Sequence, residues 1–309
     1  MNIVIKNEKV GLRIDLVVLD ILNEESLSRA IIQRYISKGC LINGKECKKG
    51  YRLKEGDTLS IDKKYWSNIK DSIDLSKNLI SQKGELDIRY EDVNLIVLYK
   101  PKGLVVHPGI GNKDNTLANY VRYYLESKNE YDCLLDRAGI VHRLDKGVSG
   151  LMVVAKNKST QEYLKGEFSR KRVIKIYRAH LEESNKFEQG IDLEKYLKEM
   201  NINFQPWKDW EKVAGYIGRD RVNRYRMEFR SYEFSGSKYA LSYILFSKNQ
   251  ALIKIDTGRM HQIRVTLRYL GYHIKGDSLY GNGKGEDIML ESVLLSFLKQ
   301  NGERLTLTV

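Results

Sequence analysis

The sequence lacks the features that mark a membrane-spanning, secreted or nucleotide-cofactor protein. No apolar run approaches the roughly 20 residues of a membrane-spanning helix. The opening stretch, MNIVIKNEKVGLRIDL, has no charged head, apolar core and small-residue cleavage site. The patterns G-x-x-x-x-G-K-(S/T) and helix-opening G-x-G-x-x-G are missing as well. We therefore expect a soluble cytoplasmic protein with no membrane partner.

Cysteine and histidine are also scarce, which bears on disulfides and metals. The three cysteines, Cys40, Cys47 and Cys133, show no C-x-x-C spacing, so neither a disulfide framework nor a zinc site is indicated. The five histidines form no H-E-x-x-H pair. The sequence predicts reduced thiols and no metal or other cofactor.

Positive charge, by contrast, is abundant. Lys and Arg number 53 against 40 for Asp and Glu, which gives a formal net charge of +13. Such an excess favours a polyanion as partner, and without a membrane segment we expect nucleic acid. The 309 residues, 42% of them hydrophobic, are enough for one large domain and one small domain.

The first 61 residues have the pattern of a small module. Apolar residues recur at helical spacing in RIDLVVLDIL and again in SLSRAIIQRYISKG, where Ser28 suits the helix N-cap and Gly39 its end. Asn43-Gly44 predicts a hairpin turn, and Gly56-Asp57 predicts a second turn before the short strand 58–61. We expect two helices followed by a hairpin and a further strand.

The order R-I-D, S-R-x-x-I-Q, L-I-N-G-K and G-D within residues 1–61 resembles the S4 RNA-binding domain. The resemblance implies a module that docks on structured RNA, with Arg29 and Arg34 on the outer face of the second helix as RNA contacts. Charge alone would leave these two side chains merely solvated. Residues 62–85 are polar with little periodicity, which indicates a linker.

Residues 86–309 form the larger unit. Apolar stretches predict strands at 95–98, 151–155, 174–179, 239–246 and 252–255, and helical spacing is found at 115–126 and 159–171. A chain in which predicted strands and predicted helices are interspersed in this way favours the α+β class with a mixed or antiparallel sheet.

Three stretches of the larger unit carry candidate chemistry. VHRLDKGVSGLMVVAKN, at 141–157, places Asp145 just before an apolar strand, which taken alone is ordinary turn chemistry. RKRVIKIYRAHL follows at 170–181 and IKIDTGRMHQIRVTLRYLGYHIKGDSLYG at 253–281. Together with YKPKGLVVHPG they resemble, in order and spacing, the RluA-type large-subunit pseudouridine synthases over about residues 88–295. The RluD-like branch of that family commonly has an S4 domain in front, which residues 1–61 match.

The resemblance implies an enzyme with the pseudouridine synthase fold that cuts the C1'–N1 bond of uridine in RNA, turns the base and rejoins it through C5 without a cofactor. The substrate it implies is the 23S RNA of the large ribosomal subunit. Asp145 matches the family's catalytic carboxylate, the nucleophile, which acts on the sugar or on the base. A carboxylate in a closed pocket needs a neighbouring cation to stay charged, and Arg264 matches the arginine that pairs with it. Tyr177 matches the active-site tyrosine, which stacks on uracil and moves a proton.

Other basic residues are candidate RNA contacts. Arg143 matches the arginine that fills the gap left by the flipped nucleotide, while His142 beside it suits a bracing role. Lys175 shares a strand face with Tyr177. Further RNA contacts are expected from Arg259, His261, Arg219, Arg221, Arg224 and Arg226. For the last four, a solvated loop is an equal alternative.

Four residues depart from the family pattern, namely Val148, Met260, Thr266 and Glu291. None removes a catalytic group, so they bear on the RNA target more than on the reaction. The rival hypothesis is a non-catalytic RNA-binding ribosome-assembly factor that keeps the synthase fold. The presence of all three expected active-site residues argues against that rival. We expect a monomer.

Overall fold

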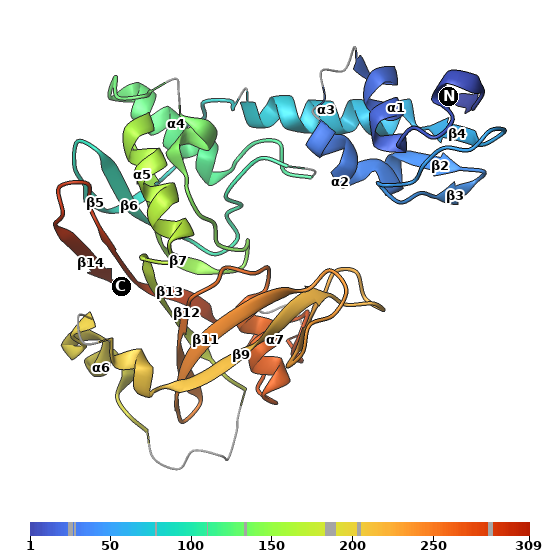
Figure 1. Cartoon of the computed structure of the whole chain (residues 1–309). Coiled ribbons are helices and arrows are strands. Elements are labelled where there is room, and N and C mark those ends of the chain that lie inside the picture. The colour runs from blue at the N-terminus through green and yellow to red at the C-terminus, as the bar shows by residue number, and fades with distance from the viewer. Residues whose placement is uncertain are drawn as a thin grey trace. The chain divides into compact units, whose positions relative to one another are not determined.

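The computed structural model describes residues 1–23, 27, 29–77, 79–109, 111–132, 135–182, 190–202, 205–283 and 287–309, and at 30, 34 and 71–77 it describes the backbone alone. The predicted N-cap, Ser28, and the third cysteine, Cys133, lie outside the described residues. The chain divides into two compact units, Met1–Asn78 with Gly109–Gly111 and Leu79–Pro108 with Asn112–Val309. We call them the small unit and the large unit (Figure 1).

The small unit packs two helices and a sheet around one core. Its first elements are β1 (Asn2–Val4), α1 (Ile14–Ile21) and α2 (Arg29–Gly39), followed by β2 (Cys40–Ile42), β3 (Lys45–Glu46) and β4 (Thr58–Ile61). The antiparallel strand order is β1-β4-β2-β3. Asn43 and Gly44 have φ angles of 50° and 76°, as a primed two-residue hairpin turn requires. The predicted helices and hairpin are therefore present.

Helix α3 (Lys63–Lys77) occupies much of the linker that the sequence predicts over 62–85. Trp66 fastens this helix to the small unit, since its indole is fully buried and donates a hydrogen bond to the carbonyl oxygen of Gly39 at 3.1 Å. A side chain at Gly39 would overlap the indole ring. Trp66 and the partly buried Tyr65 thus pack this helix on the core of the small unit, and residues 63–77 form a helix where the sequence predicts a polar linker.

The large unit is built on one mixed sheet (Figure 1). Ten of the described strands join it in the order β10-β9-β11-β12-β8-β13-β7-β6-β5, with β14 beside β13. The pair β13 and β7 is parallel and the other pairs are antiparallel. The strands are β5 (Asp87–Glu91), β6 (Leu95–Lys100), β7 (Ser149–Ala155), β8 (Ile174–His180), β9 (Glu211–Arg219), β10 (Met227–Arg230), β11 (Lys238–Ser247), β12 (Gln250–Ile255), β13 (Leu290–Leu298) and β14 (Arg304–Thr308). The predicted α+β class with a mixed sheet is confirmed.

Helices pack on both halves of this sheet. They are α4 (Leu117–Ser127), α5 (Lys158–Ser169), α6 (Leu193–Glu199) and α7 (Gln262–Tyr269). Helix α5 contacts β7 (Figure 1), and α7 contacts β10 in the other half of the sheet. None of the described helices is both long enough and apolar enough to cross a membrane.

Strand β7 fixes the segment in front of it, residues 141–148. All seven residues of β7 are buried, because the strand lies inside the sheet between β6 and β13. Gly150 has a φ of 120° and lies so close to β13 that a Cβ would overlap the backbone of Ser292. The loop that carries Asp145 therefore leads directly into a strand with no room to shift.

Gly150→Ala is expected to lower the free energy of unfolding by about 2–4 kcal/mol, because the added methyl meets the backbone of Ser292 and L residues avoid this φ. Gly302→Ala is the matched control. Its φ is 83° and nothing lies within 4 Å of an added Cβ, so a loss of about 1 kcal/mol is expected. Urea denaturation of the two variants measures the difference, and equal losses would contradict the close approach of β7 and β13.

Candidate active site

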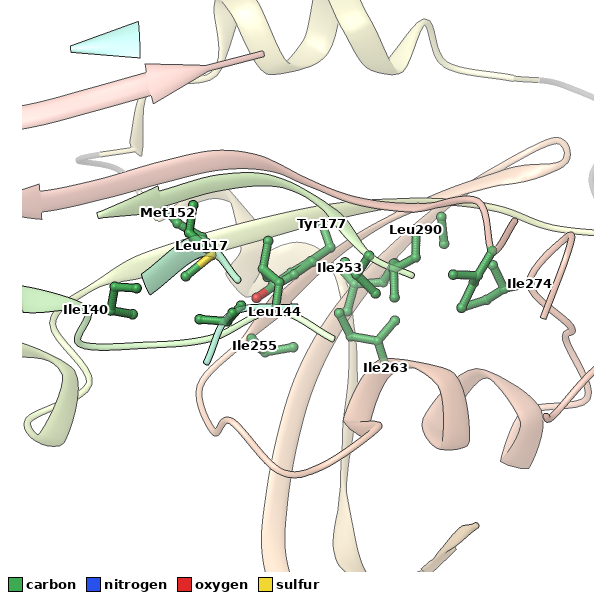
Figure 2. Packing of buried hydrophobic residues seen from close by; sticks show 14 of the residues in the cluster. Leu117, Ile140, Leu144, Met152, Tyr177, Ile253, Ile255, Ile263, Ile274 and Leu290 are labelled. Atoms are coloured by element: carbon green, nitrogen blue, oxygen red, sulfur yellow. The ribbon is translucent and has the colours of Figure 1, made fainter. Parts of the chain in front are cut away.

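A cavity of about 420 Å³ opens in the large unit beside the loop that precedes β7. Its walls come from that loop, from β8 and from the segment that enters α7. Asp145, Tyr177 and Arg264 all line it, so the structure brings together the three residues that the sequence predicts as catalytic. Apolar side chains close its inner wall, and in Figure 2 Tyr177 lies among Leu144, Ile253 and Ile255.

Asp145 lies in a turn that its own backbone closes, since the Val148 amide donates to the Asp145 carbonyl oxygen at 3.1 Å. The carboxylate is accessible, with 35% of its side-chain surface exposed. Its negative charge acts on three basic groups around it, raising the pKa of Arg264 and opposing the pKa depression that burial imposes on Lys100 and His261. The cavity therefore surrounds one accessible carboxylate with basic side chains.

Lys100, at the end of β6, contacts the Asp145 loop through the carbonyl oxygen of Lys146. Its fully buried ammonium donates to the carbonyl oxygens of Pro101 at 2.8 Å, Leu104 at 2.9 Å and Lys146 at 3.3 Å. Burial lowers the pKa of Lys100 to about 8, against the opposing charge of Asp145. The sequence predicts no catalytic or binding role for Lys100, and the signal that could mark it is a lysine at the end of an apolar strand.

Arg264 does not pair with Asp145, so the ion pair that the family resemblance implies is wrong. Its Nε donates to Asp277 Oδ2 at 2.8 Å and its second nitrogen to Oδ1 at 2.7 Å. Asp277 also accepts the backbone amides of Leu279 and Tyr280. Burial would raise the pKa of Asp277, but the bonds from Arg264 outweigh burial and lower it. The almost fully buried Asp277 needs the two-donor partner, whereas the accessible Asp145 can be solvated.

Tyr177 lies in the middle of β8, with only 6% of its surface exposed. Burial, and then the charge of Asp145, raise the pKa of its hydroxyl well above the usual range. The phenol is therefore neutral at pH 7 and can donate a proton in a hydrogen bond. Its flat ring at the cavity wall offers a stacking surface.

His261, predicted from the sequence as an RNA contact, lines the cavity. Its Nε2 is 3.9 Å from Asp145 Oδ2, and its Nδ1 is 2.8 Å from the hydroxyl of Tyr280. The residue is the N-cap of α7 with a φ of 54°, a backbone conformation that is uncommon for residues other than glycine. Tyr280 and Asp277 both belong to the stretch GDSLYG, and the sequence predicts no role for either residue.

A second cavity of about 290 Å³ adjoins the first and shares Arg143, Lys175, Ile255 and Gly258 with it. The Lys175 ammonium lies 5.4 Å from the centre of the Phe168 ring and has no hydrogen-bond acceptor among the residues that the structure describes. Burial lowers the pKa of Lys175 to about 8, and the nearby Lys254 adds to this. An unpaired ammonium in a cavity wall is a candidate anion site.

His142 braces the loop before β7. Its Nε2 accepts the amide of Val153 at 3.0 Å, and its ring stacks on Phe168 with centroids 4.8 Å apart. Burial, and then the charge of Lys175, lower the pKa of His142 to about 3, so the ring is neutral. It has the contacts of a structural residue.

The remaining predicted RNA contacts are spread over the surface. Arg259 donates to the Tyr239 carbonyl oxygen at 2.8 Å and lines the first cavity. Of the four arginines near the turn between β9 and β10, Arg219, Arg221 and Arg224 are exposed, while the Nε of Arg226 is buried and has no partner among the described residues. In the small unit Arg29 pairs with the buried Asp15 at 3.0 Å. The side chain of Arg34 lies outside the described residues.

The four departures from the family pattern have distinct surroundings. Val148 is buried in the core, and Met260 is exposed at the cavity. Thr266 is buried, and its hydroxyl has no partner among the described residues. Glu291 accepts hydrogen bonds from Tyr99 at 2.6 Å and from Arg178 at 2.8 Å. Among the residues that the structure describes, no cluster of His, Cys, Asp or Glu is arranged to hold a metal ion.

Asp277→Asn is expected to lower the free energy of unfolding by about 3 kcal/mol at pH 7, because it leaves the charge of Arg264 largely buried and unpaired. The folded-state pKa of Asp277 is lowered, so the pair stabilises the protein above the unfolded pKa, and this contribution is lost as the pH falls through the folded pKa. The deficit of the variant should therefore shrink below about pH 4. Urea denaturation across this range measures it.

Asp87→Asn is the control for this variant. It breaks an exposed two-donor pair with Arg89, with distances of 2.7 and 2.8 Å. Solvent screens such a pair, so its loss should cost less than about 1 kcal/mol. A similar loss of unfolding free energy in both variants would show that burial does not make the Arg264 pair more stabilising than the exposed pair.

The sequence matches the family model described as RNA pseudouridylate synthase over residues 94–269. A ribosomal large subunit pseudouridine synthase D of Zymomonas mobilis subsp. mobilis is 30% identical over 307 residues, which are 97% of this chain and 86% of the relative. A protein of the same name from Buchnera aphidicola subsp. Acyrthosiphon pisum is 33% identical and covers 89% of this chain and 77% of its own length.

A solved structure supports the fold. Human RNA pseudouridylate synthase domain containing 1 has a TM-score of 0.53 at 22% identity, covering 74% of this chain and 85% of the human chain. Together with the family match over residues 94–269, these relatives show that the chain belongs to the RNA pseudouridylate synthase family, enzymes that isomerise uridine in RNA to pseudouridine.

Proposed function

We propose that this enzyme forms pseudouridine in the 23S RNA of the large ribosomal subunit, with Asp145 as nucleophile. The observation that carries the proposal is the cavity in which the accessible carboxylate of Asp145 lies among three basic groups and beside Tyr177. The names of the relatives from Zymomonas and Buchnera support the choice of RNA. A ribosomal substrate implies action in the cytoplasm, and we expect the enzyme to act as a monomer.

The reaction needs no oxidant and no cofactor, because it exchanges one bond for another. Asp145 acts as nucleophile on the sugar or on the base, the C1'–N1 bond breaks, and a C1'–C5 bond forms after the base turns. The proton on C5 leaves and N1 gains a proton, so the isomerisation is balanced. Tyr177 stacks on the uracil, and its neutral hydroxyl donates to a base oxygen or relays a proton.

Arg264 acts on Asp145 from a distance and not through the direct ion pair that the sequence predicts. Asp277 occupies its two donors, but its charge still raises the potential at Asp145, as the effect of Asp145 on the Arg264 pKa indicates. We propose that the positive charges of Arg264 and Lys100 together stabilise the negative charge of Asp145 once RNA closes the cavity.

RNA reaches this cavity along a basic surface in our proposal. Arg143 fills the gap left by the flipped uridine, and Lys175 binds a phosphate next to it, since both line the two adjoining cavities. The exposed turn between β9 and β10 adds Arg221, Arg224 and the 82% exposed Tyr225 as contacts for single-stranded RNA. The small unit acts as an S4-like RNA-binding domain with Arg29 and Arg34 among its contacts.

Asp145→Asn is expected to abolish pseudouridine formation while leaving RNA affinity within about twofold, because the amide keeps the shape of the side chain but is no nucleophile. Pseudouridine mapping in total RNA from cells with the wild-type gene, without the gene, and with the variant measures the loss. Asp87→Asn, an exposed carboxylate on β5, is the control and should restore every modified site.

Two outcomes would count against the proposal. If the Asp145→Asn enzyme is fully active, Asp145 is not the nucleophile. Cells that lack the gene but lose no pseudouridine would instead favour the ribosome-assembly factor.

Lys175→Met is expected to weaken RNA binding about five- to tenfold and to reduce the slope of log affinity against log salt by about 0.7–0.9, as the loss of one phosphate contact does. The pKa of free Lys175 is about 8, so the difference from wild type should narrow as the pH rises above 8. Affinity measurements with ribosomal RNA at several salt concentrations test this. The control is the exposed Lys208→Met, and an equal effect of the two changes would show that Lys175 contributes only general charge.

A further inference from the structure

The hydroxyl of Tyr280 links two parts of the large unit to the active-site histidine. It accepts the backbone amide of Met227, the first residue of β10, at 2.6 Å. The same oxygen is 2.8 Å from His261 Nδ1. Tyr280 is 4% exposed, and its ring meets the His261 ring edge to face, with centroids 5.5 Å apart. The contact between the two side chains is therefore shielded from solvent.

The donors around this hydroxyl determine where His261 carries its proton. The oxygen of Tyr280 already accepts one bond from Met227, and its own O–H needs an acceptor. Among the described residues, Nδ1 of His261 is the acceptor within reach. A neutral imidazole that accepts at Nδ1 must carry its proton on Nε2, and Nε2 is the nitrogen 3.9 Å from Asp145 Oδ2.

We propose that Tyr280 is a positioning residue that holds His261 in the Nε2–H tautomer, so that His261 donates a hydrogen bond to the carboxylate of Asp145 during catalysis. The inference rests on the proposed function of Asp145. The distance of 3.9 Å exceeds a hydrogen bond by about 1 Å, which a small movement of two side chains closes when the uridine enters. The opposite tautomer would place a lone pair of Nε2 against the carboxylate.

Charged groups on several elements face this pair. Burial lowers the pKa of His261 below 6.5; the positive charges of Arg264 and Arg219 lower it further, and the negative charges of Asp145 and Asp277 oppose this. Asp145 is faced in turn by Lys100, Arg264, His261 and the hydroxyl of Tyr177. His261 is therefore neutral at pH 7, and its tautomer decides whether it attracts or repels the carboxylate.

The first test reads the tautomer directly and does not depend on activity. Nitrogen NMR of the protein labelled at histidine should show the proton of His261 on Nε2 throughout pH 7–8. Tyr280→Phe should give a mixture of the two tautomers, and His261→Gln identifies the resonances. A wild-type His261 with its proton on Nδ1 would overturn the proposal, even if the enzyme forms pseudouridine as expected.

The second test measures catalysis. Tyr280→Phe should reduce kcat about tenfold at pH 8, the rate equivalent of one hydrogen bond, with KM for RNA unchanged. The loss should diminish as the pH falls through the His261 pKa, because a protonated imidazole donates from Nε2 without help from Tyr280. Tyr163→Phe, which removes a hydroxyl bonded to the Lys299 carbonyl oxygen away from the cavity, is the control.

A merely structural role for Tyr280 gives a different result. In His261→Gln the amide nitrogen takes the place of Nε2 and has no tautomers, so adding Tyr280→Phe should not change kcat further. The amide of His261→Asn is shorter and does not extend to Asp145, so this variant should not keep the activity that His261→Gln retains. A loss that is independent of pH and equal in the wild-type and His261→Gln backgrounds would overturn the proposal. If wild-type protein forms no pseudouridine, the proposed function fails while the tautomer measurement still stands.

Discussion

The two-donor pair between Arg264 and Asp277 sets the geometry on which the active-site cavity depends. Asp277 has almost no exposed surface and receives four hydrogen bonds, two from Arg264 and two from backbone amides. A charge so far from water is stable only with this complement of donors. The pair therefore ties the first turn of α7 to the segment before β13. His261, the N-cap of α7, lines the cavity next to this link, and the ring of Tyr280 lies beneath the Arg264 guanidinium.

The opposite wall depends on strand burial instead of charge. Strand β7 has no exposed residue, and Gly150 lets β13 approach its backbone closely. Lys100 then ties the end of β6 to the loop through the carbonyl oxygen of Lys146, while its other two acceptors, Pro101 and Leu104, follow β6 itself. The turn that carries Asp145 is thus fixed by β7 and by Lys100 while its carboxylate stays accessible. This arrangement suits a nucleophile, which needs a fixed backbone and an uncovered oxygen.

Much of this could be predicted from the sequence, because local patterns carry it. The hairpin at Asn43-Gly44, the buried strand at 151–155 and the mixed sheet follow from turn residues and apolar runs. The partner of Arg264 could not be predicted, since two carboxylates compete for one guanidinium and only the fold decides which is buried. Helix α3 was missed because two adjacent residues, Tyr65 and Trp66, pack it on the core of the small unit, and adjacent residues give no helical periodicity.

The corrected pairing of Arg264 changes the electrostatic argument for the proposed nucleophile. A direct two-donor pair would cover both oxygens of Asp145 and lower their reactivity. Here Arg264 is bonded to Asp277 and Lys100 to backbone carbonyls, so both lend positive charge without occupying the oxygens of Asp145. A group whose donors are already satisfied also keeps its place when the substrate enters, which limits the reorganisation that the reaction requires. Positive charges fixed by other partners therefore lie close to the proposed nucleophile and still leave its oxygens uncovered.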